Sequence, residues 1–190
     1  MIPSQQGMQL INERRGEALV VSATTALREW GSISERRDLD LDLSDCMDKA
    51  PGVGLGLAIA QPERKVLVLD HGSVLRTNLG SLVTIGNAAP SNLVHFVMED
   101  EDHPSTDGLP IPGMDNINFR ALAQDGGYAR IYQFDSLEDL MFSMEEVMEG
   151  PGPTFVSLKV YHDGDIPAYP TRSMADSLKT VRESLDSTPY

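Results

Sequence analysis

Short apolar runs recur along the chain and alternate with segments of helical spacing. Runs such as EALVVS (17–22), KVLVLD (65–70) and TFVSLKVY (154–161) have the length of buried β-strands. The predicted strands cover residues 17–22, 38–42, 65–70, 92–98, 128–134 and 154–161. The predicted helices cover residues 24–33, 51–61, 75–88, 117–127, 135–150 and 174–185. Several strands are apolar on both faces, so the pattern predicts a three-layer α/β/α fold with a mostly parallel sheet.

Two predicted helices carry more specific signals. In the helix over 135–150, Asp135 is the expected N-cap and Glu138 the expected third helical residue, and the methionines on its apolar stripe are expected to pack in the core. In the segment PGVGLGLAIAQ (51–61), Pro51 suits a first helical turn, and the small residues would let the helix approach the sheet closely.

The length of 190 residues predicts a single domain over 1–190. We expect its core to span about 16–162 and a surface tail with a short helix to follow over 163–190. The chain shows neither a secretory signal pattern nor an apolar run long enough for a membrane span, which favours a cytoplasmic protein.

Charge and cysteine content narrow the classes of function. The net charge is −14, from 29 acidic and 15 basic residues, which disfavours binding to nucleic acid or to anionic lipid. Cys46 is the single cysteine, so an internal disulfide framework and a cysteine-rich metal site are excluded. We expect Cys46 to be a packing residue, since its acidic surroundings would raise the pKa of a thiol.

Polar residues follow several predicted strands at their carboxyl ends. These residues are Ser22, Asp70 with His71, the segment 98–100, and Tyr161 with His162. Ligands of open parallel sheets bind at that edge. A turn-rich acidic segment, 99–116, follows one of these strands and exceeds the usual length of a connection, which is typical of functional loops.

The order of motifs resembles a known family. The segments GVGLGLAIAQPERKVLVLD (52–70), NLGSLVTIGNAAPSNLVHFVMED (78–100) and PGPTFVSLKV (151–160), with STDGLPIPG and NFRALAQDGGY between the last two, are similar to the pyrophosphate-binding domain of thiamine diphosphate (ThDP) enzymes. The similarity is greatest to the small subunit of sulfopyruvate decarboxylase and to the corresponding part of phosphonopyruvate decarboxylase. It covers roughly residues 16–162.

The resemblance implies a subunit of a 2-keto acid decarboxylase that uses ThDP and Mg²⁺ and acts on a small 2-keto acid. It also implies a homo-oligomer, or a hetero-oligomer with a pyrimidine-binding subunit, because the family builds its active site between subunits. The implied cofactor-binding residues are Gly72, Ser73, Asn78 and Met47. The implied metal ligands are Asp70, His71, Asp100 and Asp102.

Three departures from the family pattern fall in the cofactor motif. The strand ends in Asp70-His71-Gly72-Ser73 where the family has Gly-Asp-Gly-Ser after a further Asp, and the next strand ends in Asp100-Glu101-Asp102-His103 where the family has Asn-Gly-x-Tyr. Asp45 and Asp48 replace two glycines of the loop before the glycine-rich helix. Two unit charges about 4 Å apart interact by roughly 4 kcal/mol at an effective dielectric constant near 20, so either carboxylate would repel a diphosphate.

Two alternative hypotheses follow from these departures. Asp45, Asp48, Asp70, His71, Asp100, Asp102 and His103 could bind a divalent metal directly, without ThDP. The chain could instead be a non-catalytic subunit that stabilises or regulates an active homologue. His95 and His162 are expected to be structural. Arg28, Arg76 and Arg172 are candidates for contact with an acidic substrate group, although the sequence does not place them.

Overall fold

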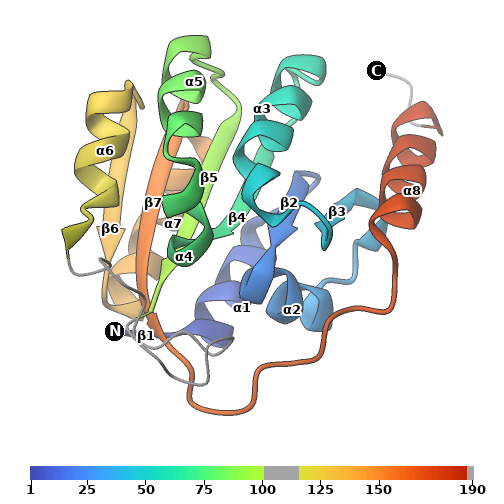
Figure 1. Ribbon diagram of the computed structural model, residues 1–190, viewed down its shortest axis with the longest axis horizontal. Helices are drawn as coiled ribbons and strands as arrows, with labels where there is room; N and C mark the ends of the chain where they lie inside the picture. Colours follow the sequence, from blue (N-terminus) through green and yellow to red (C-terminus); the bar gives the residue numbers. More distant parts are fainter. Residues whose placement is uncertain (101–115, 188–190) are drawn as a thin grey trace.

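The computed structural model describes residues 1–100 and 116–187 and has the predicted α/β architecture (Figure 1). The strands are β1 (Ile2–Pro3), β2 (Leu19–Ala23), β3 (Asp40–Leu43), β4 (Val66–His71), β5 (Leu93–Glu99), β6 (Arg130–Phe134) and β7 (Thr154–Tyr161). They form one sheet in the order β1-β7-β5-β4-β2-β3, and β6 also pairs with β7. Every pairing is parallel, so the carboxyl ends of the strands lie at one edge.

Helices cover both faces of this sheet. They are α1 (Ser4–Arg14), α2 (Thr24–Ile33), α3 (Ala50–Ala60), α4 (Gly72–Leu75), α5 (Gly80–Ala88), α6 (Phe119–Gly126), α7 (Leu137–Glu149) and α8 (Met174–Ser187). One apolar core joins the sheet to α1, α2 and α7, and a second joins it to α3, α5, α6 and α8. Alternate residues of β4 pack in the two cores. Leu67 and Leu69 lie in the first, and Val66 and Val68 lie in the second.

Helix α3 lies close to the sheet, as its small residues predicted. A Cβ atom added at Gly54 would stand 2.2 Å from Cγ2 of Val68, so a larger residue would push the helix off the strand. Pro51 lies in the first turn of this helix. The approach fixes the start of α3, and therefore the loop before it, next to the ends of β2 and β4.

The structure differs from the sequence predictions in three places. Residues 2–14, which lay outside the expected core, form β1 and α1, and Met8 and Ile11 of α1 are fully buried. The single helix expected over 75–88 is divided into α4, a 3₁₀ turn (Arg76–Asn78) and α5. Helix α7 is capped by the side chain of Ser136, which accepts a hydrogen bond from the amide of Asp139, so Asp135 is not the N-cap and Glu138 is the second helical residue.

Ion pairs hold the edge strand β3 in place. Asp40 and Asp42 of this strand pair with Arg15, Arg37 and Arg172, and we term these five residues the arginine cluster. Asp40 is fully buried and pairs with Arg15 at 2.7 Å and with Arg37 at 3.1 Å. Arg172 pairs with Asp42 at 3.0 Å and donates to the backbone carbonyl of Asp40 at 2.7 Å. The cluster therefore fixes the chain that enters α8 against β3.

None of the helices within residues 1–100 and 116–187 is long and apolar enough to cross a membrane.

Candidate functional site at the carboxyl edge of the sheet

The parallel sheet brings the predicted polar residues together at its carboxyl edge. Asp70 and His71 end β4, where they lie opposite Val97 and Met98 of β5. Asp100 follows β5 directly, and His162 follows β7 directly. Because β7, β5 and β4 are neighbours in the sheet, these side chains meet around the end of β5. Residues at three of the strand ends named from the sequence, those of β4, β5 and β7, thus form one site, and Ser22 is not part of it.

Asp70 is fully buried, and protein nitrogens approach both of its carboxylate oxygens. The backbone N–H of His71 donates to Oδ1 at 2.8 Å, and Nε2 of His95 lies 3.4 Å from Oδ2. Nδ1 of His95 contacts the hydroxyl of Tyr128 at 2.9 Å. Burial, and then the charge of Asp70, raise the pKa of Tyr128, so the phenol keeps its proton and can donate it to His95.

Asp100 lies between two imidazoles, one at each oxygen. Nε2 of His71 is 3.1 Å from Oδ1, and Nε2 of His162 is 3.3 Å from Oδ2. Both contacts are within ion-pair distance, although their angles fall short of a regular hydrogen bond. Burial alone would raise the pKa of Asp100, but interactions with His162 and His71 outweigh it and hold the pKa well below its usual value. Asp100 is therefore a carboxylate at neutral pH.

The turn after β4 orients the ring of His71. Its Nδ1 lies 2.8 Å from the hydroxyl of Ser73 and accepts the backbone N–H of Ser73 at 3.3 Å, which caps α4. This arrangement leaves Nε2 to face Asp100. Hydroxyl, imidazole and carboxylate in this order can pass a proton along the line.

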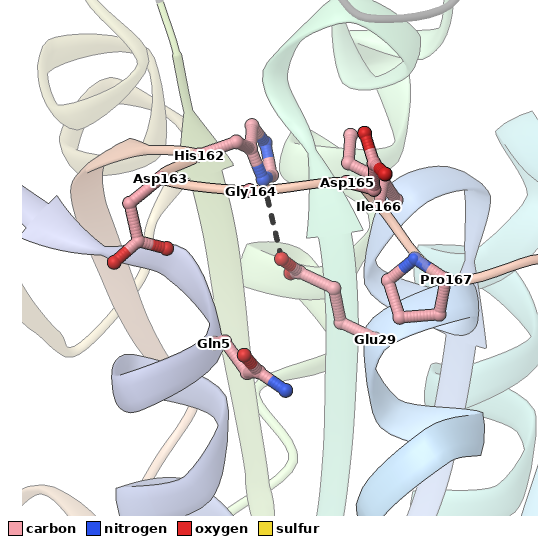
Figure 2. Close-up of a pocket in the computed structure, with 8 residues that line it drawn as sticks. All are labelled: Gln5, Glu29, His162, Asp163, Gly164, Asp165, Ile166 and Pro167. Carbon is pink, nitrogen blue, oxygen red and sulfur yellow. Dashed lines mark ion pairs between the residues drawn. The ribbon is translucent and has the colours of Figure 1, made fainter.

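His162 continues the line of contacts to the other side of the sheet. Its Nδ1 pairs with Oε1 of Glu29 at 3.2 Å, as Figure 2 shows, and Oε2 of Glu29 accepts a hydrogen bond from Ser4 at 2.6 Å. Burial would lower the pKa of His162, but Asp100 and Glu29 raise it to about 9. The imidazole between these two carboxylates is therefore positively charged at neutral pH.

We term this set of side chains the histidine network. Its members are Ser4, Glu29, Asp70, His71, Ser73, His95, Asp100, Tyr128 and His162. A cavity of about 30 Å³, lined by Gln5, Glu29 and His162 together with residues 163–167, lies beside the network (Figure 2).

Sequence reasoning did not place Glu29 or Tyr128 in the site, and it named His162 at a strand end but expected it to be structural. His162 carried a usable signal, because it directly follows a predicted strand whose carboxyl end lies at the ligand-binding edge. Glu29 carried none, since it lies within a helix and reaches the site only because α2 packs beside the end of β2.

The predicted cofactor-binding residues divide into two groups. Gly72 is buried and Ser73 half-buried at the start of α4, next to His71. Asn78 instead donates to the backbone carbonyl of Asp48 at 2.6 Å, and Met47 packs at the rim of the second apolar core. Asp102, a predicted metal ligand, and His103 lie outside the described residues.

The loop before α3 holds its two acidic side chains locally. Asp48 forms an ion pair with the neighbouring Lys49, and exposed Asp45 accepts a hydrogen bond from Ser44 at 3.1 Å. Cys46 lies 3.6 Å from the sulfur of Met174 in α8, which agrees with a packing role.

The candidate arginines are also placed by the fold. Arg28 donates to the backbone carbonyls of Ile166 and Pro167 and stacks on Tyr169, so it holds the C-terminal tail. Arg172 belongs to the arginine cluster. Arg76, in the turn before α5, has a buried guanidinium nitrogen, Nη1, without a hydrogen-bond partner among the described residues.

These residues do not fit the magnesium and diphosphate site that the resemblance implied. Mg²⁺ needs carboxylate oxygens open to an octahedral shell, whereas each oxygen of Asp70 and Asp100 already faces a protein nitrogen. His71 and His162 approach different oxygens of Asp100 and do not surround a common point. Within residues 1–100 and 116–187, no group of three or more His, Cys, Asp or Glu side chains is arranged to hold a metal ion.

Comparisons with known proteins support the resemblance. The chain is 36% identical over 153 residues to the phosphonopyruvate decarboxylase of Streptomyces viridochromogenes, which is 80% of this chain and 38% of that enzyme. It is 34% identical over 113 residues to the beta subunit of sulfopyruvate decarboxylase from Methanothermobacter thermautotrophicus, which is 60% of this chain and 58% of that subunit. No family model matches the chain.

A solved structure confirms the fold. An enzyme from Mycobacterium smegmatis, assigned to the thiamin diphosphate-dependent class, superposes with a TM-score of 0.70 at 15% identity and covers 84% of this chain and 32% of its own. The chain thus spans well under half of the phosphonopyruvate decarboxylase it matches. It is a homologue of part of the phosphonopyruvate decarboxylases and of the sulfopyruvate decarboxylase beta subunits, as the sequence resemblance predicted.

Proposed function

We propose that the chain is a divergent subunit of a cytoplasmic ThDP-type 2-keto acid decarboxylase and acts together with a separate pyrimidine-binding subunit. The observation that carries this proposal is the alignment over 153 residues with phosphonopyruvate decarboxylase, of which the chain covers 38%. The beta subunits of sulfopyruvate decarboxylase that match the chain are by name parts of such an assembly.

The surface of α3 and α5 supports assembly with a partner. None of the residues of α3 has a polar side chain, and none of those of α5 is charged. Their exposed positions include Gly52, Gly56, Ile59 and Val83, and the last two are 64% and 60% exposed. A helix that is apolar all round is usually buried. In a chain with a net charge of −14, this uncharged face is the natural contact surface for another subunit.

Homology makes ThDP with Mg²⁺ the expected cofactor of the assembly, and a phosphonate- or sulfonate-bearing 2-keto acid the expected substrate. The described residues of this chain do not form the family's metal site. We therefore propose that cofactor and substrate are held mainly by other subunits, and that this chain stabilises or regulates them. A direct metal site, the other alternative, would need ligands beyond those that the described residues bring together.

Co-expression with a pyrimidine-binding subunit tests the proposal. Size-exclusion chromatography with light scattering should show a complex, and CO₂ release from phosphonopyruvate and sulfopyruvate should require it. Ile59→Glu on α3 should weaken the complex by about 30-fold or more, because a buried charge would replace an apolar contact. Leu178→Glu is the matched control, since Leu178 is 48% exposed and lies on α8, outside α3 and α5.

Two results would argue against the proposal. The chain alone could release CO₂ from a 2-keto acid as fast as the mixture, which would make the partner unnecessary. Alternatively, Ile59→Glu and Leu178→Glu could bind the partner equally well, which would remove the α3 and α5 face from the contact.

A further inference from the structure

A bound metal ion and the histidine network would both need the carboxylate oxygens of Asp70 and Asp100. A divalent cation at the ends of β4 and β5 would need Asp70 and Asp100 to turn oxygens toward it. In the structure, one amide and three imidazoles face those four oxygens at 2.8 to 3.4 Å. Three of the four histidines in the chain are used for this purpose.

We propose that the chain has replaced the divalent cation of this edge with its own histidines, so that the imidazole of His162, held between Asp100 and Glu29, takes the place of a metal ion beside these carboxylates. The proposal rests on which protein nitrogens lie within 3.4 Å of the carboxylate oxygens. It concerns the isolated chain and does not depend on the decarboxylase role.

The two carboxylates beside His162 explain why a cation is needed there. Asp100 and Glu29 are both buried, with side chains 3% and 4% exposed, and they approach the same ring from opposite nitrogens. Two buried carboxylates without a cation between them would be strongly destabilising. The imidazole, whose own side chain is 13% exposed, satisfies both at once.

The C-terminal tail holds this imidazole in place. The segment that begins at His162 runs along the carboxyl edge and past the start of α2 before it reaches α8 (Figure 1). Arg28 binds the backbone carbonyls of Ile166 and Pro167 in its first part, and Arg172 anchors its end to Asp42. A residue between these anchors and β7 has little freedom to leave the site, so the internal cation is part of the fold and not an exchangeable ligand.

The first experiment titrates the purified wild-type chain by calorimetry with Mg²⁺ alone, with Mn²⁺ alone, and with ThDP plus Mg²⁺. We expect no binding with a Kd below about 1 mM. The Tm should also be the same in EDTA and in excess Mg²⁺, whereas a ligand at about 100 times its Kd would raise it by several degrees.

The second experiment removes the internal cation. His162→Gln keeps a polar side chain of similar reach but leaves Asp100 and Glu29 facing each other without positive charge. Its Tm should fall by several degrees, and Mg²⁺ or Mn²⁺ should now restore part of the loss, because a cation can enter the space between the carboxylates. The control Arg182→Gln also removes a positive charge, but from an exposed pair on α8, and should show neither effect.

Several results would overturn the proposal. One is micromolar binding of Mg²⁺, or of ThDP with Mg²⁺, to the wild-type chain that is lost in Asp70→Asn or Asp100→Asn. Another is a His162→Gln chain with an unchanged Tm. If His162→Gln does not fold, the wild-type titrations still decide the question. A wild-type chain that binds neither metal nor ThDP but assembles with a pyrimidine-binding subunit supports both this proposal and the proposed function. A chain that binds ThDP and also assembles overturns this proposal and leaves the proposed function in place.

Discussion

Two groups of buried carboxylates in this sheet are neutralised in different ways. Asp40 and Asp42, on the edge strand β3, are paired with arginines. Asp70 and Asp100, at the ends of the central strands β4 and β5, are paired with histidines. An arginine remains charged throughout the accessible pH range, whereas a histidine changes its charge within it. The arginine cluster is therefore a fixed structural clamp, and the histidine network is the part of the fold that responds to pH.

Their positions explain the difference. The arginine cluster joins β3, the last strand of the sheet, to the segment that enters α8. The histidine network lies at the carboxyl edge of the sheet, where ligands of open parallel sheets bind. The carboxylates of β3 are paired with side chains that stay charged, whereas those at the ends of β4 and β5 are paired with side chains that titrate.

The largest expected loss in the free energy of unfolding comes from a substitution in the arginine cluster. Asp40→Asn removes a fully buried charge that pairs with both Arg15 and Arg37. Breaking a buried pair from one side costs about 3–5 kcal/mol, because the other partner stays buried without compensation. Urea unfolding should show this loss with little change between pH 6 and 9. Asp38→Asn, at a half-exposed side chain, is the control, and a similar loss in both variants would contradict the role given to Asp40.

The next effect is the pH response of the histidine network. Folding raises the pKa of His162 from 6.5 to about 9, so its contribution to stability is fully present below pH 6.5 and is lost as the pH rises through 9. The pKa of Asp100 is lowered on folding, so the contribution of that carboxylate is present above its ordinary pKa and is lost in acid.

Urea unfolding of the wild-type chain should therefore lose roughly 1–3 kcal/mol between pH 6.5 and pH 9. In His162→Gln this slope should be absent, because the titrating group is gone. NMR titration of the His162 ring provides the direct check. An ordinary pKa for that ring, or an equal slope in the variant, would show that another group titrates in this range.

A smaller effect concerns the far end of the network. Tyr128→Phe deletes the hydroxyl that contacts Nδ1 of His95 and leaves that nitrogen buried without its partner. A loss of about 1–2 kcal/mol in the free energy of unfolding is expected. Tyr161→Phe, at a tyrosine that is 42% exposed, should change it little. Equal effects in the two variants would mean that the phenol does not support His95.

The smallest effect tests whether arginine pairs in general stabilise this fold. Arg36 pairs with Glu17 and Asp38 near the arginine cluster, but all three side chains are at least 40% exposed. Arg36→Gln should cost less than about 1 kcal/mol, because solvent screens such pairs. A loss as large as that of Asp40→Asn would show that burial is not what distinguishes the cluster.

Much of the fold followed from the sequence because its signals are local. The apolar runs of the strands, the glycine and proline positions around α3, and the alternation of strands and helices gave the parallel three-layer architecture, and the motif order gave the homology. The segment 2–14 was missed because α1 is mostly polar in sequence, with few apolar residues to show a stripe. Its burial depends on contacts with α2 and α7, which are distant in the chain.

The site was predictable only in part. The sequence alone determined which residues end the strands, and with them Asp70, His71, Asp100 and His162 at a common edge, because parallel strands place their carboxyl ends together. The tertiary structure alone decided what those residues bind. Glu29 and Tyr128 enter from elements far away in sequence, and the oxygens of Asp70 and Asp100 face imidazoles and an amide instead of an open space. Spacing along a chain fixes which residues can meet, but only packing fixes which atoms face each other and whether room for a cation is left between them.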